Sequence, residues 1–80
     1  MKSARKMFKE LGYECTTYWC GFKTMLEYWS EEDTNNWKHI FFDFETKSYF
    51  ADEHNELMYV DMKTFKAIQK QLEELGWLEE

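Results

Sequence analysis

The chain is 80 residues long, 20% of them aromatic, and carries a formal net charge of −6. This length corresponds to one domain, residues 1–80, because chains divide into separate cores only when they are much longer. The aromatic side chains supply enough apolar surface for a core without disulfides or a metal. No apolar run approaches the roughly 20 residues of a membrane-spanning helix, so we expect no membrane association.

Cysteine usage indicates a reducing compartment. The chain has only two cysteines, Cys15 and Cys20, together with three glycines and no proline. Small secreted domains usually carry several disulfides, and the charged start of this chain does not resemble a signal peptide. We therefore expect reduced thiols and a cytoplasmic location.

Two segments predict amphipathic helices, one near each end of the sequence. Their apolar residues follow the i, i+3, i+4, i+7 spacing of a helix face. The first stripe is Ala4, Met7, Phe8 and Leu11, and the second is Phe65, Ile68, Leu72 and Leu75. Ser3 and Asp61 are suited to begin these helices, and Gly12 and Gly76 to end them in the left-handed conformation.

The segment between the helices predicts an antiparallel sheet. Apolar and polar residues alternate over 37–44, and the polar residues 45–48 form a turn into a strand at 49–51. Further strands are predicted at 22–29 and 57–60, with a charged loop at 31–36. Residues 13–20 form either another strand, which we favour, or an irregular crossover. The expected fold class is α+β: two layers, with an antiparallel sheet of three to five strands and both helices packed on one face.

Both ends of the sequence carry motifs that resemble a known group of proteins. The motifs are Met7-Phe8-x-x-Leu11-Gly12-Tyr13 and Ala67-Ile68-x-x-Gln71-x-x-Glu74-Leu75-Gly76-Trp77. They resemble small uncharacterised proteins encoded by phages, prophages and mobile elements of Gram-positive bacteria. The resemblance covers both helices and extends loosely to the strands. It implies a setting in the bacterial cytoplasm and supplies no site residue.

The sequence does not predict a metal site or a cofactor. The available ligands, Cys15, Cys20, His39 and His54, follow a C-x4-C-x18-H-x14-H spacing, whereas structural zinc sites pair ligands a few residues apart. The chain also has no glycine-rich loop for phosphate. We therefore expect a protein that is not an enzyme, although a thiol-dependent activity of either cysteine with His39 stays as an alternative.

Negative charge gathers in the middle of the chain, where residues 27–61 hold ten acids and two lysines. Such strands would repel a phosphate backbone, so direct nucleic-acid binding is not expected. An acidic surface in polar loops, formed by Asp52, Glu53 and Glu56, would instead suit a nucleic-acid mimic. Solubility alone is the other explanation for this charge.

Surplus aromatic residues predict a protein interface. If Ile40, Phe42 and Phe44 face the helices, alternate residues of the same strand face away from them. The candidate interface is Trp37, His39, Phe41 and Trp29, with Tyr18, Trp19 and Tyr28 as further candidates. Exposed apolar patches mark interfaces, although a twisted sheet and long loops would also bury such rings.

These observations predict a non-enzymatic protein that binds a protein partner or regulates one. The partner is another protein or a second copy of the chain. The alternative is an acidic inhibitor that acts on a nucleic-acid-processing protein of the host.

Overall fold

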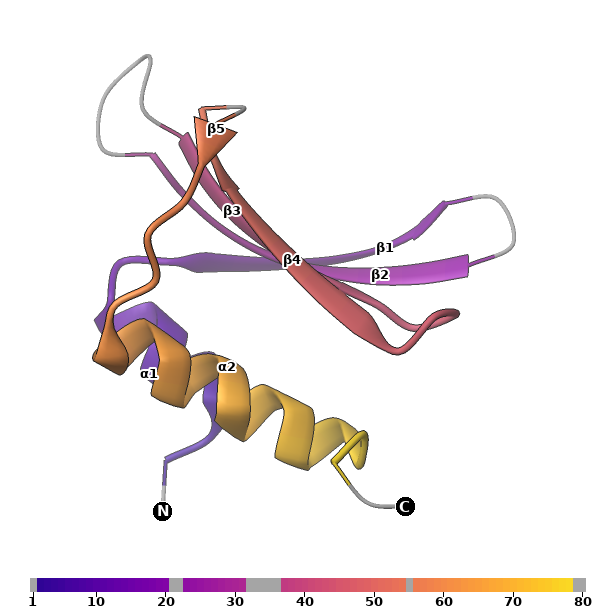
Figure 1. The fold of residues 1–80 in the computed structure, drawn as a ribbon. Helices are drawn as coiled ribbons and strands as arrows, with labels where there is room; N and C mark the ends of the chain where they lie inside the picture. Colours follow the sequence, from indigo (N-terminus) through magenta and orange to yellow (C-terminus); the bar gives the residue numbers. More distant parts are fainter. Residues whose placement is uncertain (1, 21–22, 32–36, 55, 79–80) are drawn as a thin grey trace. The chain divides into compact units, whose positions relative to one another are not determined.

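The computed structural model describes residues 2–20, 23–31, 37–54 and 56–78, and the side chains of these residues except 18–20, 23 and 56. The elements are α1 (Ala4–Glu10), β1 (Glu14–Cys20), β2 (Lys23–Glu31), β3 (Trp37–Asp43), β4 (Ser48–Glu53), β5 (Glu56–Leu57) and α2 (Met62–Leu75) (Figure 1). The predicted α+β class, with an antiparallel sheet between two terminal helices, is confirmed.

The backbone divides into two compact units. A helical unit comprises Met1–Tyr13 and Tyr59–Glu80, and a sheet unit comprises Glu14–Met58. The packing of both helices on one face of the sheet stays a prediction.

The helix α1 begins and ends as its sequence predicts. The Ser3 hydroxyl accepts a hydrogen bond from the backbone N–H of Lys6 at 3.2 Å. Gly12, with φ of 95°, reverses the chain after the helix. The Tyr13 N–H then donates to the Phe8 carbonyl at 2.9 Å, and the two rings meet edge to face at 5.6 Å. These contacts satisfy backbone groups that a helix end leaves unpaired.

The helix α2 uses the same two devices. The Asp61 carboxylate accepts from the backbone N–H of Thr64 at 2.8 Å. At the other end Gly76 has φ of 75°, and the Trp77 N–H donates to the Leu72 carbonyl at 3.1 Å. Both predicted ends of this helix are confirmed.

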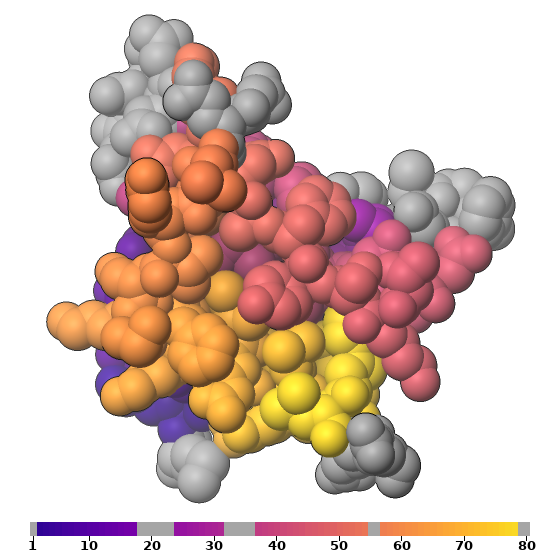
Figure 2. All heavy atoms as spheres, in the orientation of Figure 1, coloured from indigo at the N-terminus to yellow at the C-terminus, as the bar shows by residue number. Residues whose placement is uncertain are grey.

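The buried side of α2 differs from the predicted stripe. The buried residues of this helix are Thr64, Ala67, Ile68 and Gln71. Phe65, predicted to belong to the core, is 43% exposed. The side of α2 that is visible in Figure 2 forms its orange-to-yellow region. Neighbouring helix positions differ by about 100°, so packing on Thr64 turns Phe65 outward. The short side chains of Thr64 and Ala67 permit closer helix packing than a phenylalanine would.

A side chain of α2 ties the two helices together. The Glu74 carboxylate accepts a hydrogen bond from the backbone N–H of Ala4 at 2.8 Å, across 70 positions of the sequence. Ala4 begins α1, where backbone N–H groups have no partner within the helix. This contact satisfies one of them with a charged acceptor.

The sheet unit is a twisted antiparallel sheet in which consecutive strands are neighbours, in the order β1 to β5 (Figure 1). The predicted strand at 13–20 and the hairpin of β3 and β4 are confirmed. The last strand is shorter than predicted, because the chain leaves β4 after two paired residues and runs on toward α2. Of the predicted loop at 31–36, Glu31 belongs to β2 and the remainder lies outside the described residues.

One face of the sheet carries most of the buried residues of the strands. Tyr28 of β2 lies opposite Ile40 of β3, and Leu26 lies opposite Phe42. Ile40 and Phe42 have no exposed surface, and Tyr28 is 2% exposed. Phe44, predicted to share this face, begins the turn after β3. Because successive side chains alternate, the residues between these positions point to the opposite face.

Candidate functional site

The opposite face of the sheet carries a continuous row of rings, which we call the aromatic face. Its members are Trp29 of β2, Trp37, His39 and Phe41 of β3, and Phe50 of β4. The centroid distances along the row are 5.9 Å for Trp29–Trp37, 6.1 Å for Trp37–His39, 5.6 Å for His39–Phe41 and 4.8 Å for Phe41–Phe50. The four interface residues predicted from the sequence therefore lie together.

The rings of β3 are stacked nearly parallel. The His39 ring makes interplanar angles of 13° with Trp37 and 8° with Phe41. Their spacing follows from the strand itself, since side chains two residues apart share a face. Contacts between rings at 4.5–7 Å are favourable, so each ring helps to hold the next in place. The row is a preorganised surface.

The rings are neither fully exposed nor fully buried. Trp29, Trp37, His39 and Phe41 are half-buried, because each covers part of its neighbour. Phe50, at the end of the row, is 49% exposed. The sequence left open whether these rings form an exposed apolar patch or are buried by the sheet and its loops, and the observed exposure lies between the two.

The three further candidates, Tyr18, Trp19 and Tyr28, are not established on this face. Tyr28 lies on the buried face, because its register with Ile40 places it there. The side chains of Tyr18 and Trp19 lie outside the described residues. Sequence reasoning missed Phe50, which lies opposite Phe41 in the β3–β4 pair. The two residues are equally distant from the centre of the observed turn at 44–47, whereas the turn predicted at 45–48 would have paired residue 43 with Phe50.

Acidic residues lie directly opposite most of these rings on the neighbouring strands. Four rings have an acidic residue as their direct cross-strand partner. The pairs are Trp29 with Glu14, Trp37 with Glu31, His39 with Asp52, and Phe41 with Glu27. No lysine or arginine is found among the side chains that the structure describes on this face of the strands. The aromatic face is therefore both apolar and acidic.

Two polar contacts hold rings of the row in place. The Nδ1 of His39 lies 2.5 Å from the Oε2 of Glu27, and the two side chains are 28% and 15% exposed. The Trp29 indole N–H donates to the Thr16 hydroxyl at 3.1 Å. A carboxylate contact on one ring nitrogen fixes the orientation of an imidazole. The contact with Glu27 therefore holds the His39 ring in a fixed orientation within the row.

Asp52 has an unsatisfied oxygen on the aromatic face. Its side chain is half-buried, and its Oδ1 is buried without a hydrogen-bond partner among the described residues. Buried polar atoms nearly always have partners, because an unpaired one costs about 1–3 kcal/mol. This oxygen is an acceptor that no described residue of the sheet uses.

The predicted acidic surface is divided between two sides of the sheet. Asp52 and Glu53 are consecutive residues of β4, so the prediction that they lie in a polar loop is wrong. Strand alternation sends Asp52 to the aromatic face and Glu53 to the other. Glu56 pairs with Glu53 in register, and its side chain lies outside the described residues.

The position of Cys15 bears on the alternative that a cysteine acts together with His39 in a thiol-dependent activity. Cys15 is a free, half-buried thiol whose register partner, Tyr28, is on the buried face. His39 is on the aromatic face, so Cys15 and His39 lie on opposite sides of the sheet. The side chain of Cys20 lies outside the described residues. Within the described ranges, no three histidine, cysteine or acidic side chains are grouped to hold a metal.

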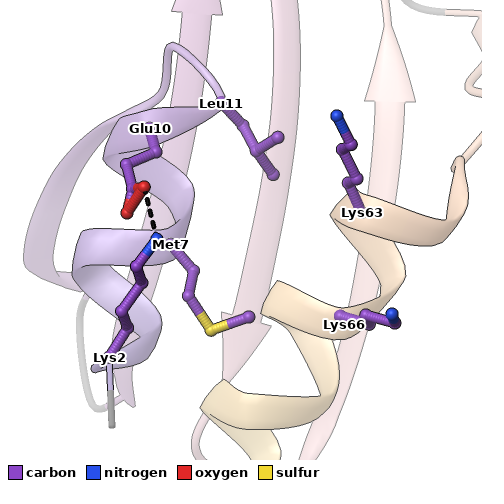
Figure 3. A pocket seen from close by; sticks show the side chains of 6 residues that line it. All are labelled: Lys2, Met7, Glu10, Leu11, Lys63 and Lys66. Carbon is purple, nitrogen blue, oxygen red and sulfur yellow. Dashed lines mark hydrogen bonds and ion pairs between the residues drawn. The ribbon is translucent and has the colours of Figure 1, made fainter.

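The helical unit has a shallow depression of its own, of about 400 Å³, between α1 and α2 (Figure 3). It is lined by Lys2, Met7, Glu10 and Leu11 on one side and by Lys63 and Lys66 on the other. The Lys2 ammonium forms an ion pair with the Glu10 carboxylate at 2.7 Å. Lys63 and Lys66 extend from α2 in Figure 3, and we assign the depression no ligand.

Within the described part of the chain, neither helix is both long and apolar enough to span a membrane. Comparisons of the chain with protein-family models, curated proteins and solved structures find no significant match.

Proposed function

We propose that this protein binds another protein through the aromatic face and has no catalytic role. The row of five neighbouring rings, of which those from Trp37 to the half-exposed Phe50 are stacked, is the observation that carries this proposal. Tryptophan and other rigid aromatic side chains dominate protein interfaces, because they bury a large area at a small entropic cost. A row that is already stacked loses little further freedom on binding.

The proposed setting is the cytoplasm of a bacterial host, with the gene carried by a phage or mobile element. This part rests on the resemblance of the helix motifs. A protein suits the aromatic face better than a nucleic acid does, because the carboxylates beside the rings repel phosphates. A regulatory role follows from a binding surface without a catalytic group.

A second candidate is an acidic inhibitor of a nucleic-acid-processing protein. It is favoured by the charge of the sheet unit, where Glu14–Met58 holds ten acids and three lysines. This candidate predicts that the substitutions Glu53→Lys and Glu56→Lys abolish binding. The aromatic-face proposal predicts that these substitutions leave binding intact, because Glu53 points to the other side of the sheet.

Affinity capture with two matched variants tests the proposal. Phe50→Ser removes an exposed ring of the aromatic face, and Phe65→Ser removes an equally exposed ring of α2. From a nuclease-treated Gram-positive lysate, wild type and Phe65→Ser should retain the same protein, and Phe50→Ser should lose it. Circular dichroism checks that both variants are folded. Equal retention by the folded Phe50→Ser variant would contradict the proposal.

A further inference from the structure

We infer that the aromatic face binds an extended, arginine-rich segment of the partner protein. This inference rests on the proposed function and adds the chemistry of the partner. Three observations carry it: the carboxylates opposite four of the five rings, the spacing of the rings along β3, and the unsatisfied oxygen of Asp52.

The first observation is the pairing of rings with carboxylates. A cation over an aromatic face within about 6 Å of the centroid gains about 0.5–2 kcal/mol. An arginine guanidinium is planar, so it stacks on a ring and donates hydrogen bonds to a carboxylate at the same time. The Trp29–Glu14 and Trp37–Glu31 pairs each place a half-buried ring beside an exposed carboxylate. The ammonium group of lysine is compact and not planar, so it does not stack on a ring while it donates hydrogen bonds to the carboxylate.

The second observation is the spacing along β3. The centroid distances from Trp37 to His39 and from His39 to Phe41 are 6.1 and 5.6 Å. In an extended segment, side chains on the same side repeat at about 6.6 Å. A segment lying along β3 therefore brings every second side chain to a successive ring. A helix does not match this row, because its side chains repeat at a different period.

The third observation is Asp52. Its buried Oδ1 has no hydrogen-bond partner among the described residues, and the torsion of a terminal carboxylate is soft. Rotation of the carboxylate presents this oxygen to a donor on the partner. An arginine reaching His39 and Asp52, which are directly opposite each other, satisfies it.

The same features argue against other occupants. An apolar partner would bury the carboxylate of Asp52 without a counter-charge, which is costly. A second copy related by twofold symmetry would place this acidic face against itself and bring like charges together. The aromatic face therefore favours a basic partner over self-association.

Fluorescence anisotropy with a defined peptide tests the inference. The probe is a labelled ten-residue peptide of alternating arginine and serine, and its control replaces each arginine by the neutral isostere citrulline. At low salt we expect the arginine peptide to bind about tenfold more tightly than the citrulline peptide. Similar affinities for the two peptides would overturn the inference.

Matched protein variants separate the aromatic face from general charge attraction. Glu14→Gln/Glu31→Gln removes two exposed carboxylates opposite the tryptophans, and Glu45→Gln/Glu73→Gln removes two exposed carboxylates elsewhere. Both double variants change the net charge equally. The first should weaken binding of the arginine peptide about fivefold, and the second less than about twofold. Equal weakening by both would show nonspecific attraction and would overturn the inference.

Failure of this inference is distinguishable from failure of the proposed function. If the arginine peptide does not bind while protein capture still depends on Phe50, the partner is not basic and the aromatic face is still an interface. If capture is also independent of Phe50, both the inference and the proposed function are wrong.

Discussion

The ring of Phe50 stacks on that of Phe41 across the β3–β4 pair, with 4.8 Å between centroids and 21° between planes. The next residue of β3, Phe42, has no exposed surface at all. Two consecutive phenylalanines of one strand thus belong to different surfaces. One contributes to the stability of the fold, and the other contributes to a partly exposed row of rings.

This difference predicts unequal costs of truncation. Phe42→Ala should lower the free energy of unfolding by about 3–5 kcal/mol, because it leaves a cavity in the core. Phe50→Ala should lower it by about 1 kcal/mol, the value of a lost ring contact at a half-exposed site. Urea denaturation measures both. Equal losses would mean that the aromatic face belongs to the core.

The contact between Glu74 and Ala4 predicts a specific effect on the helical unit. Glu74→Ala should lower the free energy of unfolding by about 1 kcal/mol, because the backbone N–H of Ala4 loses its acceptor. Glu73→Ala is the matched control, since it makes the same change at the preceding, exposed position of α2. If thermal unfolding shows equal losses for both variants, the contact does not contribute.

The left-handed backbone conformation of Gly76 predicts that a substitution at this position lowers the free energy of unfolding. Gly76→Ala should lower the free energy of unfolding by about 1 kcal/mol, because an alanine at φ of 75° is strained. A Cβ atom at this position meets no atom within 4 Å, so the loss is conformational and not steric. Gly76→Asn should lose less, since asparagine tolerates this region better. Denaturant unfolding ranks the three proteins, and an asparagine variant less stable than the alanine variant would contradict this explanation.

The ion pair of α1 predicts a titration that NMR can follow. The hydrogen bond from Lys2, with the nearby charges of Lys2 and Lys6, lowers the pKa of the exposed Glu10 carboxyl below its ordinary value of 4.5. A lowered pKa in the folded state means that the stabilisation is present above the ordinary value and is lost as the pH falls through the lowered one. Lys2→Met should bring the pKa of Glu10 back toward 4.5. An unchanged titration would show that the pair does not form in solution.

The helix ends could be predicted from the sequence, because caps depend on residues that are close in the chain. Ser3, Asp61 and Gly76 each act within one turn of their own helix. The outward position of Phe65 could not be predicted in this way. The rotation of α2 about its axis depends on packing partners, and the hydrophobicity of one residue does not determine it.

The candidate site was predicted in part. Alternation within β3 placed Trp37, His39 and Phe41 on one face, which requires only the period of a strand. The cross-strand carboxylates and Phe50 required the register between strands. Asp52 was assigned to a loop because acidic residues are depleted in strands, whereas here register places it opposite His39.

The indole N–H signals of the tryptophans, followed by NMR during titration with the captured partner, test the central claim most directly. Trp29 and Trp37 report on the aromatic face, and Trp77, after α2 in the helical unit, is an internal control. The account predicts large shifts for Trp29 and Trp37 and little change for Trp77. Shifts confined to Trp77, with Trp29 and Trp37 unchanged at saturation, would contradict it.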